Sequence, residues 1–190
     1  MFFTSIFCPP PADSAVLRFI ISRNWALLFR TRGGFLMQRF VADRMLGKLA
    51  KWLRVFGYDV VYLRQGADEE IVERLGEGRI FLTRGRRAGS WQQLGKVFVV
   101  NANEPKNQLR EVIQGLRLDM IDAELFSRCL SCNCLLDTVS REEVRTEVPD
   151  YIYQTQSQFH RCCDCGKVYW AGSHSEKMRQ QLEEILADSD

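Results

Sequence analysis

Six of the seven cysteines fall in two short clusters, and their spacing is the strongest chemical signal in the sequence. Cys129 and Cys132 form one Cys-x-x-Cys pair, Cys162 and Cys165 form another, and 29 residues separate the two pairs. A Cys-x-x-Cys turn presents two thiolates from one short segment, and zinc takes four such ligands in a tetrahedron. Because four thiolates leave no open coordination position, the pattern predicts a structural zinc ion.

The choice among the six clustered cysteines depends on the residue that follows each pair. Asn133 follows the first pair and Gly166 follows the second, and both residue types tolerate the positive φ angle of a metal-binding turn. Cys134 and Cys163 are then spare thiols. Spacing alone also admits swapped registers that use Cys134 or Cys163 as ligands. Buried or redox-active thiols without a metal are the competing interpretation.

Cysteine usage and the start of the chain bear on where the protein works. Secreted disulfide proteins usually have an even number of cysteines and an export signal, whereas this chain has seven cysteines. The first residues, MFFTSIFCPPPADS, lack the basic start and continuous apolar run of such a signal. The apolar stretch 15–29 contains Arg18, Arg23 and Asn24, so it is too short and too charged to span a bilayer. We therefore expect a soluble, cytoplasmic protein without a membrane partner.

Carboxylates at the ends of predicted strands form the second chemical signal. Asp43 ends one apolar run, Asp59 begins the next, and Asp68, Glu69 and Glu70 open a helical pattern. Several carboxylates at one edge of a parallel sheet can hold a hard divalent cation that acts on phosphates. The ordinary explanation is structural, since Asp43 can also cap the helix that follows it.

Basic residues lie near these acids and are candidate contacts to a nucleic-acid backbone. They are Arg84, Arg86 and Arg87 in a predicted loop, and Lys48 and Lys51 on a predicted helix. The alternative is that they are simply solvated. The net charge is only +2, but residues 37–126 have 15 basic and 12 acidic side chains, whereas residues 127–190 have 7 and 11. Any nucleic-acid surface is therefore expected in the middle of the chain.

Hydrophobic periodicity indicates the elements that must position these residues. Apolar runs at 38–43, 58–63, 79–83 and 96–100 predict strands, and helical spacing predicts helices near 45–56, 68–75 and 174–187. Pro105 fits the first turn of a further helix that runs to about residue 116. Strands that alternate with helices through short connections indicate an α/β fold, with a parallel sheet covered by helices. The site of such a sheet lies at the carboxyl ends of its strands.

The chain is thus predicted to have three parts. Residues 1–36 show no clean periodicity and are interpreted as a poorly ordered or wrongly included extension before Met37. The alternative is an amphipathic segment, 16–29, that docks on the core. Residues 37–126 form the predicted α/β domain, and residues 127–190 form a zinc ribbon with a C-terminal helix.

The run from Asp43 to Asp59, DRMLGKLAKWLRVFGYD, resembles the opening motif of the Mut-seven C-terminal RNase domain family. Three later segments agree in order: IFLTR ending at Arg84, FSRCLSCN starting at Phe126, and the run from Cys162 to His174. The resemblance implies a PIN-like three-layer α/β/α core followed by a zinc ribbon. It also implies an endoribonuclease that acts on RNA with Mg²⁺ or Mn²⁺.

The resemblance assigns roles to several acids. Asp43 matches the first-strand acid that holds the divalent metal in PIN-like enzymes. Asp68 and its neighbours Glu69 and Glu70 lie where a second metal-binding acid is expected. Asp59 matches a recurrent acid with a catalytic or structural role. The predicted catalytic set is Asp43, Asp59, Asp68 and Glu69.

One position departs from the family pattern. A third acid should directly follow Arg84, but the residue there is Gly85. Activity is then expected to be weak or absent unless another acid substitutes, and Glu104 is the candidate because it follows the last predicted strand. The alternative function is a non-catalytic RNA- or protein-binding module stabilised by zinc.

Overall fold

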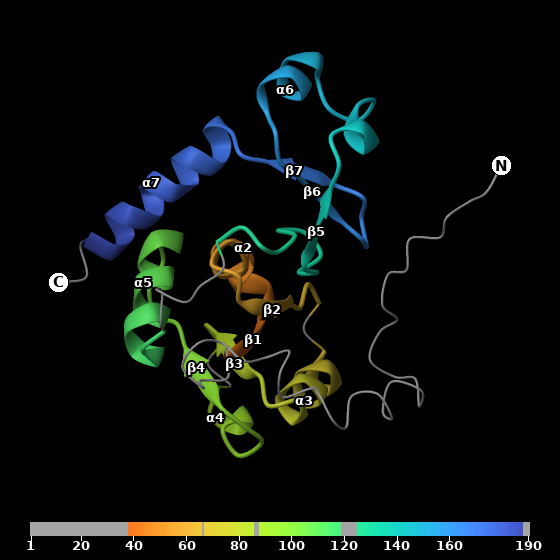
Figure 1. Ribbon diagram of the computed structural model, residues 1–190. Coiled ribbons are helices and arrows are strands. Elements are labelled where there is room, and N and C mark those ends of the chain that lie inside the picture. Colours follow the sequence, from red (N-terminus) through yellow and green to blue (C-terminus); the bar gives the residue numbers. More distant parts are fainter. Residues whose placement is uncertain (1–37, 66, 86–87, 119–124, 188–190) are drawn as a thin grey trace, which may run out of the picture. The chain divides into compact units, whose positions relative to one another are not determined.

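The computed structural model describes residues 38–65, 67–85, 88–118 and 125–187 (Figure 1). All of them belong to one unit of the chain, Gln38–Asp190. The predicted extension over residues 1–36, with its amphipathic alternative, lies outside the described residues. Within the described ranges, no helix has both the length and the apolar character needed to cross a membrane.

Four short parallel strands form the sheet that the apolar runs predict. They are β1 (Arg39–Ala42), β2 (Asp59–Tyr62), β3 (Ile80–Thr83) and β4 (Val97–Val99). Their order across the sheet is β2-β1-β3-β4, and each neighbouring pair is parallel. The two central strands, β1 and β3, are almost wholly buried. Burial on both faces explains why their sequences are nearly continuous apolar runs instead of alternating ones.

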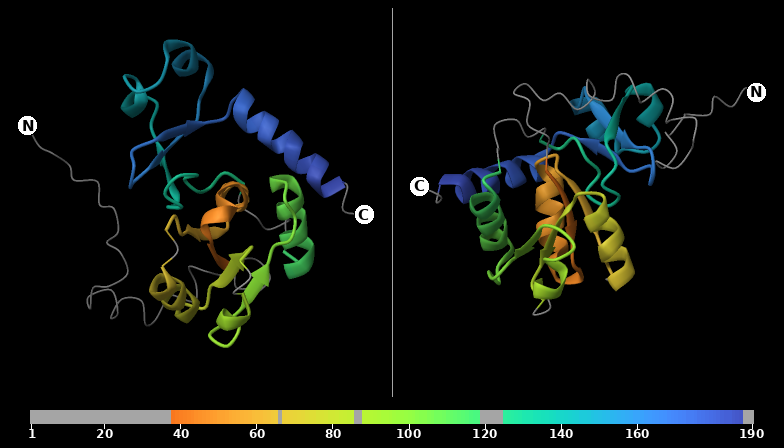
Figure 2. Two further views of the ribbon diagram at one scale, coloured as in Figure 1. Left: turned by 180° about the vertical axis from the view of Figure 1, so that it is seen from behind. Right: turned by 90° about the horizontal axis from the view of Figure 1, so that it is seen from below.

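Helices connect the strands and cover both faces of the sheet (Figures 1 and 2). They are η1 (Arg44–Leu46) and α2 (Gly47–Val55) after β1, α3 (Asp68–Gly76) after β2, α4 (Ala88–Trp91) after β3, and α5 (Pro105–Leu116) after β4. On one face, Ile71 of α3 and Trp91 of α4 pack in a hydrophobic cluster with Phe81. On the other face α5 contacts α2, and the ring of Phe98 lies against Gly115. The predicted α/β fold with helices on both faces of a parallel sheet is confirmed.

Successive strands are added on opposite sides of β1, which makes the space between β1 and β3 a topological switch point. From β1 the chain moves to β2 on one side, then returns to β3 on the other side of β1. The loops that leave the carboxyl ends of β1 and β3 therefore diverge, and open α/β sheets bind their ligands in the crevice at such a point. Asp43 directly follows β1 and Arg84 directly follows β3.

The cysteine module, residues 127–172, contains a second and smaller sheet. Its antiparallel strands are β5 (Leu136–Val139), β6 (Phe159–Cys162) and β7 (Val168–Trp170), with η2 (Glu142–Val144) and α6 (Asp150–Thr155) between β5 and β6. Its own hydrophobic cluster is centred on Val144, Val148 and Phe159. So small a core cannot stabilise a module of this length, so another stabilising element is needed.

The last helix, α7 (Ser173–Ala187), packs beside α5 (Figure 1). Leu182 and Ile185 are buried, as the apolar face of this segment predicts. Arg110 Nε of α5 donates to the carbonyl oxygen of Ile185 (3.4 Å), and Lys106 Nζ lies 3.1 Å from a carboxylate oxygen of Glu184. The helix therefore follows the cysteine module in sequence but packs against a helix of the α/β core.

Candidate active site and metal centre

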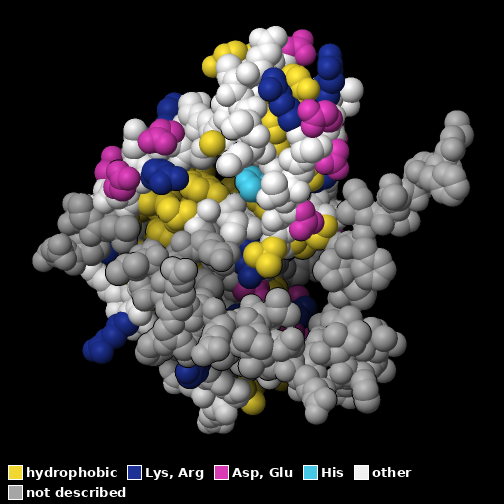
Figure 3. All heavy atoms as spheres, viewed as in Figure 1, with side chains coloured by type: hydrophobic (Ala, Val, Ile, Leu, Met, Phe, Trp, Pro, Cys, Tyr) yellow, Lys and Arg dark blue, Asp and Glu magenta, His cyan; other side chains and the backbone are white. Residues whose placement is uncertain are grey.

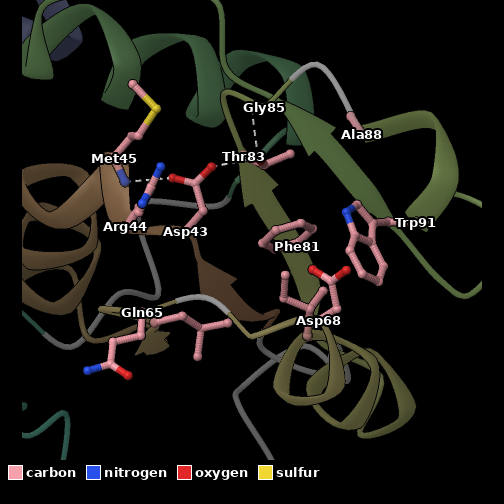
Figure 4. Close-up of a pocket in the computed structure, with 12 residues that line it drawn as sticks. Asp43, Arg44, Met45, Gln65, Asp68, Phe81, Thr83, Gly85, Ala88 and Trp91 are labelled. Carbon is pink, nitrogen blue, oxygen red and sulfur yellow. Dashed lines mark hydrogen bonds between the residues drawn. The ribbon is translucent and has the colours of Figure 1, made fainter.

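A cavity of about 320 Å³ lies where the carboxyl ends of β1 and β3 meet the start of α3 (Figure 4). Two of the predicted catalytic acids, Asp43 and Asp68, line it. Thr83 and Gly85 contribute the wall that follows β3, and Trp91 contributes the wall from α4. We call this cavity the acid pocket.

Both oxygens of the Asp43 carboxylate accept hydrogen bonds. Oδ1 accepts from the backbone N–H of Met45 (2.8 Å), which makes Asp43 the N-cap of η1. Oδ2 accepts from Thr83 Oγ1 (2.5 Å) and from the backbone N–H of Arg84 (3.0 Å). A carboxylate offers about four lone pairs, so these bonds leave roughly one for another partner. The Asp43 carboxylate is therefore held between β1 and β3. It caps η1 and also faces the cavity.

Asp68 lines the acid pocket from α3. It is the first residue of that helix, whose first turn also holds Glu69 and Glu70. Three acids there are favourable because a helix N-terminus has a partial positive charge. Figure 4 places the Asp68 side chain across the pocket from Asp43, beside Trp91. Glu69 is exposed and does not line the pocket, so the structure brings together Asp43 and Asp68 only.

The position expected to hold a third acid, Gly85, also lines the pocket. Its backbone N–H donates to Thr83 Oγ1 (2.9 Å), and a Cβ at this position would lie 3.2 Å from the same oxygen. A larger residue would therefore fit only after a small shift of Thr83. Among the described residues that line the pocket, Asp43 and Asp68 are the only acids.

Glu104, the predicted substitute, does not line the pocket either. It is exposed at the N-cap position of α5. A different acid, Glu111 of α5, was not predicted. Its carboxylate accepts hydrogen bonds from the backbone N–H groups of Asn101 and Ala102 and from the Asn101 side chain, at 2.9 to 3.0 Å. Burial alone would raise the pKa of Glu111, but these donors and the charge of Arg84 hold that pKa below its ordinary value.

Asp59 lies at the opposite end of the sheet, where it pairs in register with Arg39 at the amino ends of the strands. Its carboxylate forms a bidentate ion pair with Arg79 (2.8 and 3.0 Å) and accepts from Asn133 Nδ2 (2.6 Å). Burial would raise the pKa of Asp59, but Arg79 and Asn133 hold it below its ordinary value. The structure does not bring Asp59 to the acid pocket, and its contacts are those of a structural residue.

The residues predicted to contact nucleic acid are Lys48, Lys51, Arg84, Arg86 and Arg87. Lys48 and Lys51 are exposed on α2, one and two turns beyond Arg44, which lines the acid pocket. Arg84 is half-buried, and its Nη2 donates to Asn103 Oδ1 (2.5 Å). Arg86 and Arg87 lie outside the described residues. The described basic side chains therefore start at the rim of the pocket and continue along α2.

The four predicted thiol ligands meet in one place. The Sγ atoms of Cys129, Cys132, Cys162 and Cys165 all lie within 4.8 Å of one another. Those of Cys129 and Cys165 are 3.7 Å apart. Four sulfurs about 2.3 Å from a tetrahedral zinc ion would be about 3.8 Å apart. These four cysteines can therefore bind a metal such as zinc, and Cys134 and Cys163 are not part of the cluster.

Both Cys-x-x-Cys pairs lie on turns of the same kind. Asn133 has a φ angle of 72° and Gly166 has one of 71°. The backbone N–H of Asn133 donates to the carbonyl of Cys129 (2.9 Å), and that of Gly166 donates to the carbonyl of Cys162 (3.0 Å). The positive φ angle predicted after each pair is therefore present.

The thiols of the cluster have very different proton affinities. Burial would raise the pKa of Cys129, but the Tyr169 hydroxyl (3.2 Å from Sγ) and the backbone N–H of Cys132 lower it to about 6. Burial raises the pKa of Cys162 to about 12 and also raises that of Cys132. A divalent cation stabilises all four thiolates at once. The donor set therefore fits such an ion.

Two of the three comparisons with known proteins found a match. A family model described as the Mut7-C RNAse domain matches residues 38–182, which is most of the chain. A protein of Homo sapiens named "Exonuclease mut-7 homolog" is 32% identical over 102 residues. The match covers 50% of this chain and 12% of that relative, so the chain spans a small part of the relative's length. No solved structure matches the chain significantly.

Proposed function

We propose that this chain, which belongs to the Mut7-C RNase domain family, is a divalent-metal-dependent endoribonuclease with weak native activity. Its family already indicates a nuclease-type function and a nucleic-acid substrate. The observation that carries the finer proposal is the presence of Asp43 and Asp68 in one cavity at the carboxyl ends of β1 and β3. The relative is named an exonuclease, but that name belongs to a much longer protein, of which the match covers 12%.

Asp43 and Asp68 are the residues that would hold Mg²⁺ or Mn²⁺, because both ions prefer carboxylate oxygens. When bound, such an ion would polarise a phosphate and lower the pKa of an attacking water. The residues of the chain hold the ligand carboxylates in place. Met45, Thr83 and Arg84 fix the Asp43 carboxylate, so that it needs no rearrangement when substrate arrives.

The remaining wall of the acid pocket suits a nucleotide. The rings of Phe81 and Trp91 pack edge to face, with centroids 6.4 Å apart, and both line the pocket. Single-stranded RNA is commonly recognised by bases that pack on aromatic rings. A base or ribose can lie against this wall while its phosphate faces the acids, and Arg44 at the rim can contact a neighbouring phosphate.

Weak activity follows from the ligands that the pocket lacks. Gly85 supplies no oxygen from its side chain, and Asp43 already uses most of its lone pairs. Two carboxylates attract a divalent cation less strongly than three do. The same observation favours the second candidate function, a non-catalytic module that binds RNA or protein.

The RNA-binding surface is proposed for the α/β core and not for the cysteine module. On the face shown in Figure 3, acidic and basic side chains are intermixed over the region of η2 and α6. Glu142, Glu143 and Glu147 alternate there with Arg141 and Arg145. A surface of mixed sign attracts a polyanion little.

We also propose that Cys129, Cys132, Cys162 and Cys165 hold one structural zinc ion per chain. Such a site requires reduced thiols, which agrees with the proposed cytoplasmic location. In this view the boundary near residue 126 separates a nuclease-type domain from a zinc ribbon.

Cleavage of labelled RNA by the purified chain, with and without Mn²⁺, tests the proposed function. We expect slow Mn²⁺-dependent cleavage that Asp43→Asn removes, because the amide cannot hold the cation. Asp137→Asn is the matched control, since Asp137 is an exposed acid on β5. RNA binding without cleavage would support the non-catalytic module. Robust cleavage that Asp43→Asn leaves unchanged would reject the acid pocket as the active site.

A further inference from the structure

Two side chains of α5 hold the short loop after β4. The Glu111 carboxylate accepts from the backbone N–H groups of Asn101 and Ala102 and from Asn101 Nδ2, at 2.9 to 3.0 Å. Gln108, only 4% exposed, donates its Nε2 to the carbonyl oxygens of Ala102 and Asn103, both at 3.1 Å. Backbone donors and backbone acceptors of the loop are thus both fixed from one helix.

Stability alone does not explain a buried amide at this place. Gln108 is buried together with Leu109 and Val112 of the same helix, and an apolar side chain there would need no hydrogen-bond partners. An exposed loop that is fixed by a rigid element commonly positions a binding residue. Here the loop holds an arginine, because Asn103 Oδ1 accepts from Arg84 Nη2 (2.5 Å).

Arg84 links this loop to the acid pocket. Its backbone N–H donates to Asp43 Oδ2 (3.0 Å), while its guanidinium donates to Asn103. The strands β3 and β4 are parallel neighbours, and the backbone N–H of Val100 donates to the carbonyl of Thr83 (2.8 Å). The chain therefore leaves both strands side by side, and the guanidinium lies along the same edge of the sheet as the acid pocket.

The charge of Arg84 is suited to bind an anion. Its described hydrogen-bond partner, Asn103, is neutral and takes one of the five N–H donors of a guanidinium. The four hydrogen bonds that Glu111 accepts use about as many lone pairs as a carboxylate has, so Glu111 holds the loop and not the guanidinium. A guanidinium of known orientation binds a phosphate through two parallel hydrogen bonds.

We propose that Arg84 binds the RNA phosphate next to the one at the acid pocket, and that Asn103, Gln108 and Glu111 are positioning residues that hold Arg84 there. The inference rests on the proposed function and extends it, because it names the direction in which the RNA strand leaves the acids. That direction is from β3 toward β4, across the carboxyl ends of the sheet.

A double-mutant cycle on RNA affinity tests whether Asn103 acts through Arg84. Affinity of the full chain for a fluorescein-labelled single-stranded RNA is measured by anisotropy, without added Mn²⁺ and at several salt concentrations. We expect Arg84→Gln to weaken binding about tenfold and to reduce the slope of log affinity against log salt by about one. Asn103→Ala should weaken binding about threefold by itself and have no effect in the Arg84→Gln background. Glu111→Gln should behave as Asn103→Ala does.

Asn107→Ala is the matched control. Asn107 Oδ1 also accepts from a guanidinium, that of Arg110 (3.0 Å), but on the side of α5 that contacts α7. The variant should leave both the affinity for RNA and the salt slope unchanged.

Additive losses from Asn103→Ala and Arg84→Gln, or an unchanged salt slope in Arg84→Gln, would overturn the inference. Thermal unfolding checks that each variant is folded. If Arg84→Gln is not, the cycle is run with Arg84→Lys, which loses the planar fork, and Asn103→Ala should then have less effect than in the wild type. A wild-type chain that does not bind RNA would reject the proposed function itself, whereas RNA binding that does not depend on Arg84 would reject only this inference.

Discussion

The two ends of the parallel sheet use acidic residues in opposite ways. At the amino ends, Asp59 is paired with the guanidinium of Arg79 and accepts a hydrogen bond from Asn133. At the carboxyl ends, the described donors to Asp43 are all neutral groups, and Asp43 faces a cavity that Asp68 also lines. A carboxylate paired with a guanidinium offers little to a metal, whereas one held by neutral donors keeps its negative charge available. The end of the strand where an acid lies therefore distinguishes the structural acid from the candidate catalytic ones.

The cysteine module docks at the amino ends. Asn133 joins the metal-binding turn to the edge of the sheet, because its Oδ1 accepts from the backbone N–H of Val60 (2.9 Å) while its Nδ2 donates to Asp59. Changes at this end should therefore reduce stability and metal binding together. Changes at the carboxyl ends should alter activity and leave stability nearly intact.

Loss of a thiol ligand should have the largest effect. Cys129→Ser or Cys162→Ser removes one of four ligands of the proposed zinc ion, and the small core of the cysteine module cannot replace the binding energy. We expect loss of the metal and unfolding of the module, measured by elemental analysis and by hydrogen exchange. Cys134→Ser and Cys163→Ser are matched controls that should keep the metal. Equal damage in all four variants would mean that the ligand assignment is wrong.

Removal of the Asp59 carboxylate should have the next largest effect. Asp59→Ala removes the bidentate partner of the Arg79 side chain, 9% exposed, which keeps only its single contact with the Glu77 carboxylate among the described acids, and it leaves the Asn133 amide without its acceptor. We expect a loss of about 3 kcal/mol in the free energy of unfolding, measured by chemical denaturation of the metal-loaded chain. Asp137→Ala, at an exposed acid, should cost almost nothing. Unchanged stability with lost ribonuclease activity would instead make Asp59 a catalytic residue.

Restoration of the third acid should give a smaller effect, on activity alone. Gly85→Asp places a carboxylate on the wall of the acid pocket after a shift of Thr83, whose Oγ1 would lie 3.2 Å from the new Cβ. We expect Mn²⁺-dependent cleavage of RNA to rise about tenfold or more, since one more carboxylate strengthens cation binding. Gly85→Asn is the matched control without charge and should show no gain.

Combination with Asp43→Asn tests whether both residues act at one site. The gain from Gly85→Asp should vanish in the double variant, because the two carboxylates would hold the same cation. A gain that persists without the Asp43 carboxylate would show that cleavage occurs elsewhere.

The sequence is a good guide to the features that depend on local pattern. The apolar runs of β1 and β3 and the helical spacing of α2 give the right elements, because burial dictates them, and Pro105 marks the start of α5. Asn133 and Gly166 indicate the right turns, because only a few residue types accept their φ angles. Helix α4 (Ala88–Trp91) is a single turn, which is too short to show a period.

Features that depend on contacts between distant segments are harder to predict. Asp59 begins its strand and Asp43 follows its own, so parallel pairing alone places them at opposite ends of the sheet. Their separation could therefore have been predicted from the sequence. The partner of Asp59, Asn133, is 74 residues away and becomes a neighbour only when the cysteine module docks. Glu111 shares a face of α5 with the buried Gln108 and Val112, but its role requires knowing that this face meets the loop after β4.

The smallest expected effect is for Glu111, near the carboxyl ends of the strands, whose carboxylate already accepts hydrogen bonds from Asn101 and Ala102. Its pKa is lower in the folded chain than the value of about 4.3 in an unfolded chain. Its contribution to stability is therefore present above that pH and is lost as the pH falls through the folded-state pKa. Glu111→Gln should cost less than about 1 kcal/mol at pH 7, because the carboxylate is partly solvated.

The difference in unfolding free energy between wild type and Glu111→Gln should shrink as the pH falls from 7 to below 4, measured by urea denaturation. The comparison cancels the acid response of the cysteine cluster, which both chains share. Glu104→Gln is the matched control, since Glu104 is exposed and makes no side-chain cap bond. A difference that grows on acidification would contradict the depressed pKa. The hydrogen bonds from Asn101 and Ala102 would then not be what stabilises the ionised Glu111 carboxylate.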